Sequence, residues 1–266
     1  MIDIAIKTAN NCAPHQQVFN TRFIAGLERH GQAWRYHGRS NWPECDLAVF
    51  WSHRAKDIIE KQQAAGGDYL VAERGYMGDR MKWTSLGFNG LNGRAEFHVD
   101  AKDSLRFQQY HFEKLHPWKD DGDYILIMGQ VHGDASIDGV DIHQWASSIV
   151  NRYKFDCPVY FRPHPLSRHV APECLNTRNG KLRTALAGAR AVITYNSNSG
   201  VDAVLAGVPT VATDRGSMVW DVSSRTAALF KTPNRTQWAA ELAWCQWLPE
   251  EIKNGDAWDH LKQRYA

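Results

Sequence analysis

Short apolar stretches alternate with amphipathic stretches along most of the chain. In the first half, aliphatic and aromatic residues predict four strands, over residues 2–8, 33–38, 45–53 and 68–75. Apolar residues at helical spacing, followed by glycine, predict two helices, over residues 15–31 and 54–67. Strands that alternate with helices in this way predict a parallel sheet covered by helices.

The same alternation restarts at residue 123. Four further strands are predicted, over residues 123–131, 158–165, 191–197 and 209–214. The predicted helices of this half cover residues 141–155, 181–190, 200–208, 235–247 and 248–266. Between the halves, residues 76–97 are rich in glycine and asparagine and predict a structured loop, and residues 104–115 are amphipathic.

A polar segment with proline and glycine, HPWKDDGD at residues 116–123, is the best candidate for a linker. The 266 residues are enough for two small domains, each with a core of its own. We therefore expect an α/β protein with two Rossmann-like β/α/β domains. The expected domains are residues 1–115 and 123–232, followed by closing helices at 233–266.

Composition excludes some classes of protein. No apolar run approaches the roughly 18 residues of a membrane span, so no integral membrane segment is expected. The N-terminus reads as a strand rather than a secretion signal, which favours the cytoplasm. The five cysteines are scattered without a CxxC pair, so we expect neither a metal site nor a dithiol. A net charge of +2 does not by itself indicate nucleic-acid binding.

Polar residues follow the predicted strands of the second half. After the strand at 123–131, Gly129 lets a ligand approach the backbone closely, and Gln130, Asp134 and Ser136 supply hydrogen-bonding groups. After the next strand, Pro165 favours an extended backbone at His164 and helps to aim its imidazole beyond the strand end. An imidazole there can donate a hydrogen bond or a proton to a phosphate, and Arg162 can add positive charge.

The turn at residues 196–200 precedes a predicted helix whose first backbone N–H groups lack partners within the helix. Such a turn predicts either an anion site or a plain helix cap, and the two can coincide. Its residues are Asn196, Ser197, Asn198, Ser199 and Gly200.

Joined in chain order, GQVHGDASI, RPHP and SNSGVDAVLAGVP resemble the bacterial β-Kdo transferases of capsule assembly. The resemblance covers residues 123–225 and is weaker in the first half. It implies the GT-B type of fold, in which an acceptor-side domain and a nucleotide-sugar-binding domain face a cleft. It also implies a CMP- or UDP-linked sugar donor, inverting transfer without a metal or other cofactor, His164 on the donor phosphate and Asp202 among the donor-binding residues.

The family's acidic base lies in an E-D-G segment, where this chain has Arg74. An arginine does not take up a proton at neutral pH, because its pKa is above about 12. The base must then be another residue, and the candidates are Glu73, Asp79 and Asp100. For Glu73, an ion pair with Arg74 or Arg80 is the alternative to catalysis.

The sequence is compatible with several other interpretations. The arginine can instead indicate transfer with retention of configuration, or a binding module without turnover. A sugar-nucleotide epimerase shares the two-lobed architecture. If the donor is CMP-Kdo, its carboxylate needs partners such as Ser197, Ser199 or Arg215.

The acceptor is either a glycan or a hydroxymethylated base in viral DNA. In the DNA reading, the loop at residues 74–94 contacts phosphates and a flipped base. The expected acceptor-binding residues are Arg74, Arg80, Trp83, Asn89 and Arg94, with Lys82 beside them.

Overall fold

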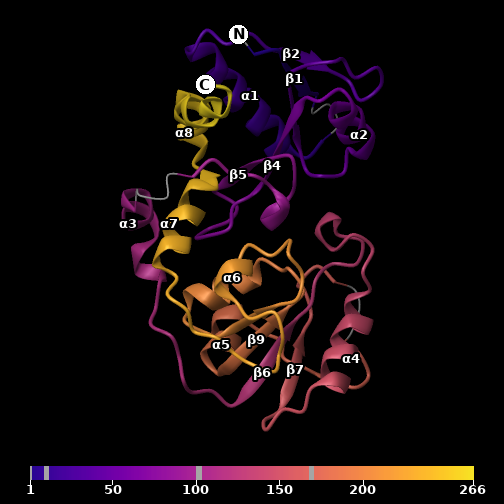
Figure 1. Cartoon of the computed structure of the whole chain (residues 1–266), viewed down its shortest axis with the longest axis vertical. Helices are drawn as coiled ribbons and strands as arrows, with labels where there is room; N and C mark the ends of the chain where they lie inside the picture. Colours follow the sequence, from indigo (N-terminus) through magenta and orange to yellow (C-terminus); the bar gives the residue numbers. More distant parts are fainter. Residues whose placement is uncertain (1, 9–11, 100–103, 168–170) are drawn as a thin grey trace. The chain divides into compact units, whose positions relative to one another are not determined.

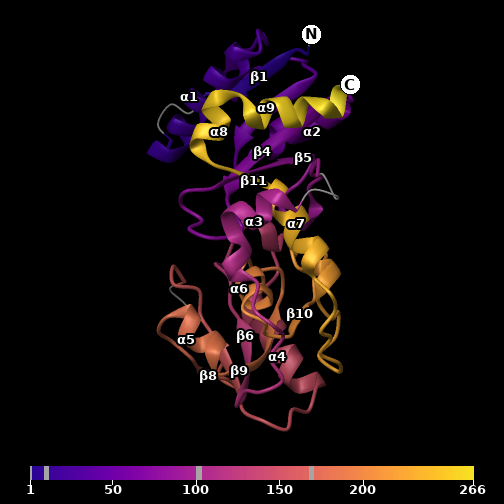
Figure 2. The same cartoon turned by 90° about the vertical axis from the view of Figure 1, so that its left-hand side faces the viewer.

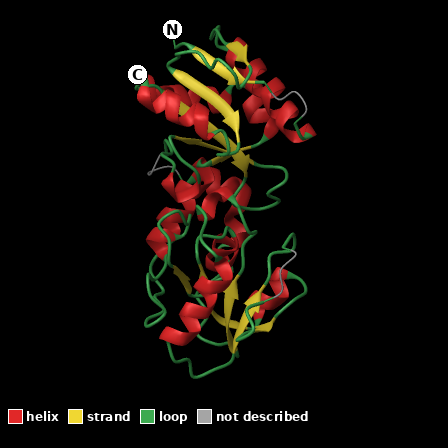
Figure 3. Cartoon of the chain, turned by 90° about the vertical axis from the view of Figure 1, so that its right-hand side faces the viewer, coloured by secondary structure: helices red, strands yellow, loops and turns green. Residues whose placement is uncertain are grey.

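The computed structural model describes residues 2–8, 12–99, 104–167 and 171–266. Contacts divide the chain into two compact units, with Met1–Arg106 and Ala240–Ala266 in unit 1 and Phe107–Ala239 in unit 2. Each unit has one sheet with helices packed on it (Figures 1 and 3). The expected α/β class with two Rossmann-like sheets is therefore confirmed. The roles expected for the two halves stay predictions.

Unit 1 contains a six-stranded sheet in the order β11-β5-β4-β3-β1-β2. Strands β2, β1, β3 and β4 are parallel, whereas β5 is antiparallel to β4 and β11 is antiparallel to β5. The strands are β1 Ile4–Lys7, β2 Arg35–His37, β3 Leu47–Trp51, β4 Asp68–Arg74, β5 Thr84–Phe88 and β11 Gln246–Trp247. The strands predicted over 2–8, 33–38, 45–53 and 68–75 are confirmed.

Alternate residues of the unit 1 strands pack on opposite faces of the sheet. Ile4, Ile6 and Val49 pack against α1 (Pro14–Arg29), α8 (Pro249–Asn254) and α9 (Asp256–Leu261). Ala48 and Phe50 pack on the other face against α2 (Lys56–Ala64). Figure 1 shows α8 beside α1, from the opposite end of the chain, and Figure 2 shows α9 following α8.

Strands β5 and β11 lie where the sequence predicted a loop and a helix. The cause is a long-range contact, because the fully buried Gln246 side chain fixes the loop after β4. Its Oε1 accepts hydrogen bonds from the backbone N–H groups of Tyr76 and Met77, at 2.6 and 2.9 Å. The helix predicted over 235–247 therefore ends early, as α7 (Thr236–Trp244), and the chain continues as β11.

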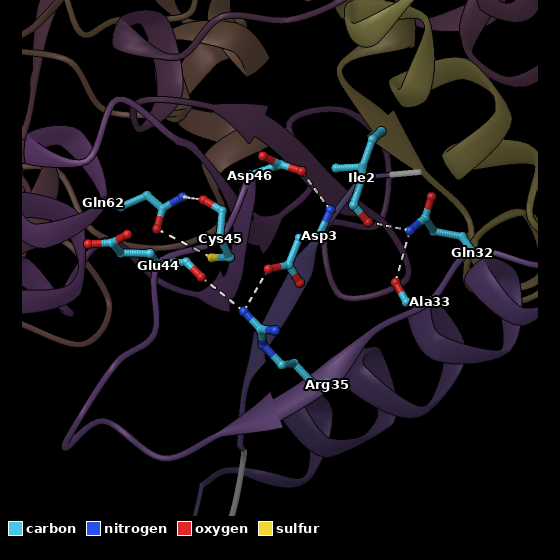
Figure 4. A network of polar contacts seen from close by, with 9 residues as sticks. All are labelled: Ile2, Asp3, Gln32, Ala33, Arg35, Glu44, Cys45, Asp46 and Gln62. Atoms are coloured by element: carbon cyan, nitrogen blue, oxygen red, sulfur yellow. Dashed lines mark hydrogen bonds and ion pairs between the residues drawn. The ribbon is translucent and has the colours of Figure 1, made fainter.

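A polar network joins the amino-terminal ends of the first strands in unit 1 (Figure 4). Asp3 Oδ2 accepts a hydrogen bond from Arg35 Nη2 at 2.7 Å, and the backbone N–H of Asp3 donates to Asp46 Oδ2 at 2.7 Å. Gln62 of α2 donates to the backbone oxygen of Cys45 at 2.7 Å. These contacts hold the strands in register at this edge of the sheet.

Unit 2 contains a parallel five-stranded sheet in the order β10-β9-β6-β7-β8. Its strands are β6 Tyr124–Met128, β7 Val159–Arg162, β8 Asn176–Thr177, β9 Ala189–Thr194 and β10 Thr210–Ala212. The four strands predicted in this half are confirmed. Strand β8 was not predicted, because its two residues are polar and exposed.

Strand β6 is buried on both faces, which explains its continuous apolar sequence. Ile125 and Ile127 pack against α4 (Ile142–Arg152). Leu126 packs on the other face against α5 (Leu182–Ala187) and α6 (Ser199–Leu205). The remaining helix is α3 (Leu105–His111), and short 3-10 turns include η3 (Ala135–Ile137).

The packing of α8 on α1 gives a test of the unit 1 fold. A Cβ on Gly26 of α1 would lie 2.2 Å from the backbone oxygen of Ile252, so Gly26→Ala must push the helices apart. Although alanine favours a helix by about 1 kcal/mol, we expect a net loss of about 1–3 kcal/mol in the free energy of unfolding. Chemical denaturation measures it. Gly38→Ala, where a Cβ meets nothing within 4 Å, is the matched control, and equal stability of the two variants would contradict the packing.

Candidate functional site

The strand order of unit 2 reverses between β6 and β9. From β6 the chain builds β7 and β8 on one side, and it then crosses to place β9 and β10 on the other. In open α/β sheets, ligands bind outside the carboxyl ends of the strands at such a reversal. Gln130 follows β6 and Asn196 follows β9. Both residues therefore lie where open α/β sheets commonly bind ligands.

Gln130 and Asn196 join the two strand ends through their side-chain amides. Gln130 Nε2 donates to Asn196 Oδ1 at 2.8 Å, and the backbone N–H of Asn196 donates to Gln130 Oε1 at 3.1 Å. Asn196 is only 3% exposed. Because the Gln130 side chain both donates to and accepts from Asn196, the bridge fixes the spacing of the β6 and β9 loops.

The bridge extends into the loops on both sides. Asn196 Nδ2 donates to the backbone oxygen of Ser136 and to Asp214 Oδ1, both at 2.7 Å. The Ser136 hydroxyl donates to Asp134 Oδ1 at 2.7 Å. The network thus connects the loops that follow β6, β9 and β10.

These contacts refine the expectation for the β6 loop. Gln130, Asp134 and Ser136 were expected to bind the donor, and the structure shows them hydrogen-bonded within the network. They hold the edge of the site in shape, and direct donor contacts from them stay a prediction. Asp214 was missed, although it is a polar residue at the carboxyl end of the strand predicted at 209–214, which could have indicated it.

A close contact with β7 explains why position 129 is a glycine, and the sequence alone did not indicate this contact. A Cβ at this position would lie 2.7 Å from the ring of Phe161 and 3.0 Å from the backbone oxygen of Arg162. A side chain at position 129 would therefore clash with β7, and only glycine lets the end of β6 lie this close to it. His164 follows β7 two residues later. Close approach of a ligand to Gly129 stays a prediction.

His164 lies just beyond the carboxyl end of β7, and it is half-buried. Its Nδ1 accepts a hydrogen bond from the backbone N–H of Leu166 at 3.1 Å. We assign the imidazole hydrogen to Nε2 from this contact, because a nitrogen that accepts carries no hydrogen. Pro165 lies in the turn that His164 and Ser167 close through a backbone hydrogen bond of 2.8 Å. The neutral imidazole is thus held as an Nε2–H donor.

Arg162 points its guanidinium toward the loop after β8. Nη1 and Nη2 donate to the backbone oxygens of Arg178 and Gly180, at 3.2 and 2.7 Å. Burial lowers the pKa of Arg162. Its expected role as positive charge beside the donor phosphate stays a prediction.

The turn before α6 presents two half-buried hydroxyls. The Oγ atoms of Ser197 and Ser199 lie 2.8 Å apart. The N–H groups of Ser197 and Gly200 are already bonded, to Thr194 Oγ1 and to the backbone oxygen of Ser197, both at 2.9 Å. The hydroxyl pair is therefore a better candidate for a ligand than the backbone of this turn.

Other residues of this turn support its packing. A Cβ on Gly200 would lie 3.2 Å from side chains of β9 and of Val219, so glycine lets α6 approach the sheet. Asn198 precedes α6, and Asp202 adds an acidic group to its first turn. An acidic group there opposes the binding of an anion at the helix end.

The acidic candidates belong to unit 1. Glu73 precedes Arg74, the last residue of β4, and its Oε1 accepts a hydrogen bond from the backbone N–H of Arg74 at 3.0 Å. Asp79 is exposed in the next loop, where its Oδ1 accepts the N–H of Met81 at 3.1 Å. Asp100 lies outside the described residues. Catalysis by any of the three stays a prediction.

The expected acceptor-binding residues differ in accessibility. Trp83 is 6% exposed and packs near the guanidinium of Arg106. Asn89 bonds to Asp68 Oδ1 at 2.6 Å and to the N–H of Tyr69 at 3.0 Å, so its amide serves the fold. Arg80 and Arg94 are exposed, and Arg74 is half-buried.

Within the described part of the chain, His, Cys, Asp and Glu side chains form no group of three that could hold a metal ion. None of the described helices combines the length and the apolar character that crossing a bilayer requires.

Two solved structures are similar to this chain over most of its length. They are two transferases of Thermosulfurimonas dismutans KpsC. The β-Kdo 2,4 transferase has a TM-score of 0.57 and 12% identity, covering 91% of this chain and 90% of that chain. The β-Kdo 2,7 transferase also has a TM-score of 0.57 and 12% identity, covering 99% of this chain and 100% of that chain. At this identity, the likeness shows the fold alone, which is that of GT-B proteins.

No protein-family model matches the sequence. No curated protein matches it either.

The amide bridge gives a test of how the site is built. Asn196→Ala removes one hydrogen-bond partner each from Gln130 Nε2, the Ser136 backbone oxygen and Asp214 in a buried place. We expect the free energy of unfolding to fall by about 2–3 kcal/mol, since unsatisfied buried polar groups cost that much. Asn151→Ala, at an exposed position of α4, is the control for chemical denaturation. Equal stability of both variants would show that the bridge does not hold the edge.

Proposed function

We propose that the chain is a glycosyltransferase that moves a sugar from a nucleotide-sugar donor to a hydroxyl acceptor. The observation that carries the proposal is the Gln130–Asn196 bridge at the strand-order reversal of unit 2. It places a fixed polar edge where α/β folds bind nucleotides. The fold shared with two Kdo transferases supports the same function.

In this proposal, unit 2 binds the nucleotide sugar outside the carboxyl ends of β6, β7 and β9. The bond between the anomeric carbon and the phosphate oxygen breaks during transfer, and negative charge develops on the leaving phosphate. His164, held with its hydrogen on Nε2, donates to that oxygen. A donor fixed in advance at the developing charge stabilises the transition state more than the ground state.

The hydroxyls of Ser197 and Ser199 suit further contacts with the donor. Each is half-buried, and because one hydroxyl donates to the other across 2.8 Å, the pair offers one further O–H donor and acceptor lone pairs to a ligand. If the donor is CMP-Kdo, they are candidates for its carboxylate, with Arg215 exposed after β10. A UDP-hexose lacks this carboxylate, so the donor class decides whether these contacts form.

The finer parts of the proposal follow from the motif resemblance. We propose a CMP-Kdo-like or UDP-hexose donor, a glycan acceptor and a reaction without metal. Polysaccharide biosynthesis is the process that such a transferase serves.

Incubation of the full chain with a panel of nucleotide sugars, with and without EDTA, tests the function. Release of free sugar and nucleotide, or transfer to added glycan, supports a transferase. Isomerisation of the sugar would mean an epimerase, and tight binding without conversion would mean a binding module. Either of these results would overturn the proposal. Loss of turnover in EDTA would overturn metal independence alone.

The role of His164 has its own test. We expect His164→Ala to lower kcat by about 10² or more, because the hydrogen bond to the leaving phosphate is lost. His116→Ala, at an exposed position of unit 2, should retain the turnover of the parent chain. Steady-state kinetics on the best donor of the panel measures both. Normal turnover in a folded His164→Ala variant would exclude this role.

A further inference from the structure

The unit 1 sheet also reverses its strand order, at the carboxyl ends of β1 and β3. The chain passes from β1 through α1 to β2 on one side, and β3 then pairs with the other side of β1. Ligands bind outside the carboxyl ends of strands at such reversals. Three side chains meet here, His15 from α1, Trp51 from β3 and Arg74 from β4.

Trp51 is the centre of this cluster. The imidazole of His15 lies with its ring centre 4.8 Å from that of the indole, at an interplanar angle of 66°. The guanidinium carbon of Arg74 lies 5.5 Å from the indole centre. Phe19 packs against the same indole at 5.7 Å and joins it to the core. The indole therefore positions an imidazole and a guanidinium at one strand edge.

Arg74 brings a positive charge to this edge. Among the residues that the structure describes, no carboxylate forms an ion pair with its guanidinium, which donates to the backbone oxygen of Met81 at 3.4 Å. The guanidinium is half-buried on the indole. A positioned guanidinium without a carboxylate suits an oxyanion, which it binds through paired hydrogen bonds.

His15 brings a neutral base. Burial lowers its pKa, and the positive charge of Arg74 lowers it further. Trp51 carries no charge, and the first turn of α1 carries no acidic residue that would oppose these effects. Within residues 2–8 and 12–99, no hydrogen bond occupies the imidazole, which is half-exposed. At neutral pH a nitrogen lone pair can therefore accept a proton.

The backbone is strained at the same edge. Ser52, directly after Trp51, has a φ of 69°, a left-handed conformation that is uncommon for a residue with a side chain. Its N–H donates to the backbone oxygen of Ala72 at 2.9 Å, which holds the turn against β4. Strain of this kind clusters at binding and catalytic sites.

We propose that this edge of unit 1 binds the acceptor, with Arg74 on an oxyanion group of that acceptor and His15 as the base for its attacking hydroxyl. This inference rests on the proposed function. The acceptor is then a molecule that carries both a sugar hydroxyl, which attacks the donor, and a carboxylate, which Arg74 binds.

In the transfer step, His15 takes up the proton and the donor phosphate is the leaving group. The acceptor hydroxyl gives its proton to a nitrogen of His15, and its oxygen forms a bond to the anomeric carbon of the donor. The bond from that carbon to the phosphate oxygen breaks, and the phosphate leaves with the electron pair. His15 then releases the proton to water. An attack of this kind inverts the anomeric configuration.

The pH dependence of turnover distinguishes a base from a merely structural histidine. We expect kcat of the full chain to fall as pH drops below the ordinary imidazole value of 6.5, because protonated His15 cannot accept the proton. His15→Gln should lower kcat by about 10²-fold and remove this acidic limb. Arg74→Ala should move the limb to higher pH and raise the KM for a carboxylate-bearing acceptor, whereas Arg74→Lys should restore part of both.

His37→Gln is the matched control. His37 ends β2, and its ring packs on Trp42 at 6.1 Å between ring centres. It should keep both the turnover and the acidic limb of the parent chain. A folded His15→Gln variant with the parent pH profile would overturn the role of His15. An unchanged KM in Arg74→Ala would overturn the oxyanion contact.

A binding measurement separates this inference from the proposed function. NMR of the full chain follows the His15 imidazole during addition of acetate, a carboxylate probe. We expect a saturable shift in the parent chain and none in Arg74→Ala, and no shift in the parent would overturn the site. If no donor of the panel is converted, the proposed function fails and His15 is not a transfer base, while the acetate titration still decides the oxyanion site.

Discussion

The pair of amide contacts between Gln130 and Asn196 is the constraint on which the site in unit 2 depends. Strands β6 and β9 pair as far as Met128 and Thr194, and the two hydrogen bonds between residues 130 and 196 continue that connection into the loops, which keeps the loop ends at a fixed spacing. Asn196 is suited to this because its buried side chain bonds both neighbouring loops at once. A ligand at this edge therefore meets a preformed surface rather than flexible loops.

The sequence pattern predicted the strands that are buried on both faces, because each of them is an uninterrupted apolar run. Strand β6 is the clearest case. The pattern failed for β5 and β11, whose pairing depends on the Gln246 side chain far along the chain. The residues around Gln246 in the sequence do not indicate that its buried side chain will accept hydrogen bonds from two backbone N–H groups of a distant loop.

For the candidate site, the motifs selected residues at strand ends that the structure joins by hydrogen bonds, but they did not predict the partner of each side chain. Residues chosen as ligand contacts, such as Gln130 and Ser136, bond to each other, and Arg162 turns toward the β8 loop. His15, which we propose as a base, has no unusual residue next to it in the sequence that would have indicated it. The rule that ligands bind where strand order reverses could have indicated it, once β1 and β3 had been placed side by side.

Arginine at position 74 has a consequence beyond the loss of a carboxylate. The half-buried setting of His15 lowers the pKa of its imidazole, and the positive charge of the Arg74 guanidinium on the same indole lowers it further. A carboxylate at position 74 would act in the opposite direction, since it would stabilise imidazolium. In the site that we propose, Arg74 thus favours the neutral form of the imidazole beside it, which is the form that a base requires.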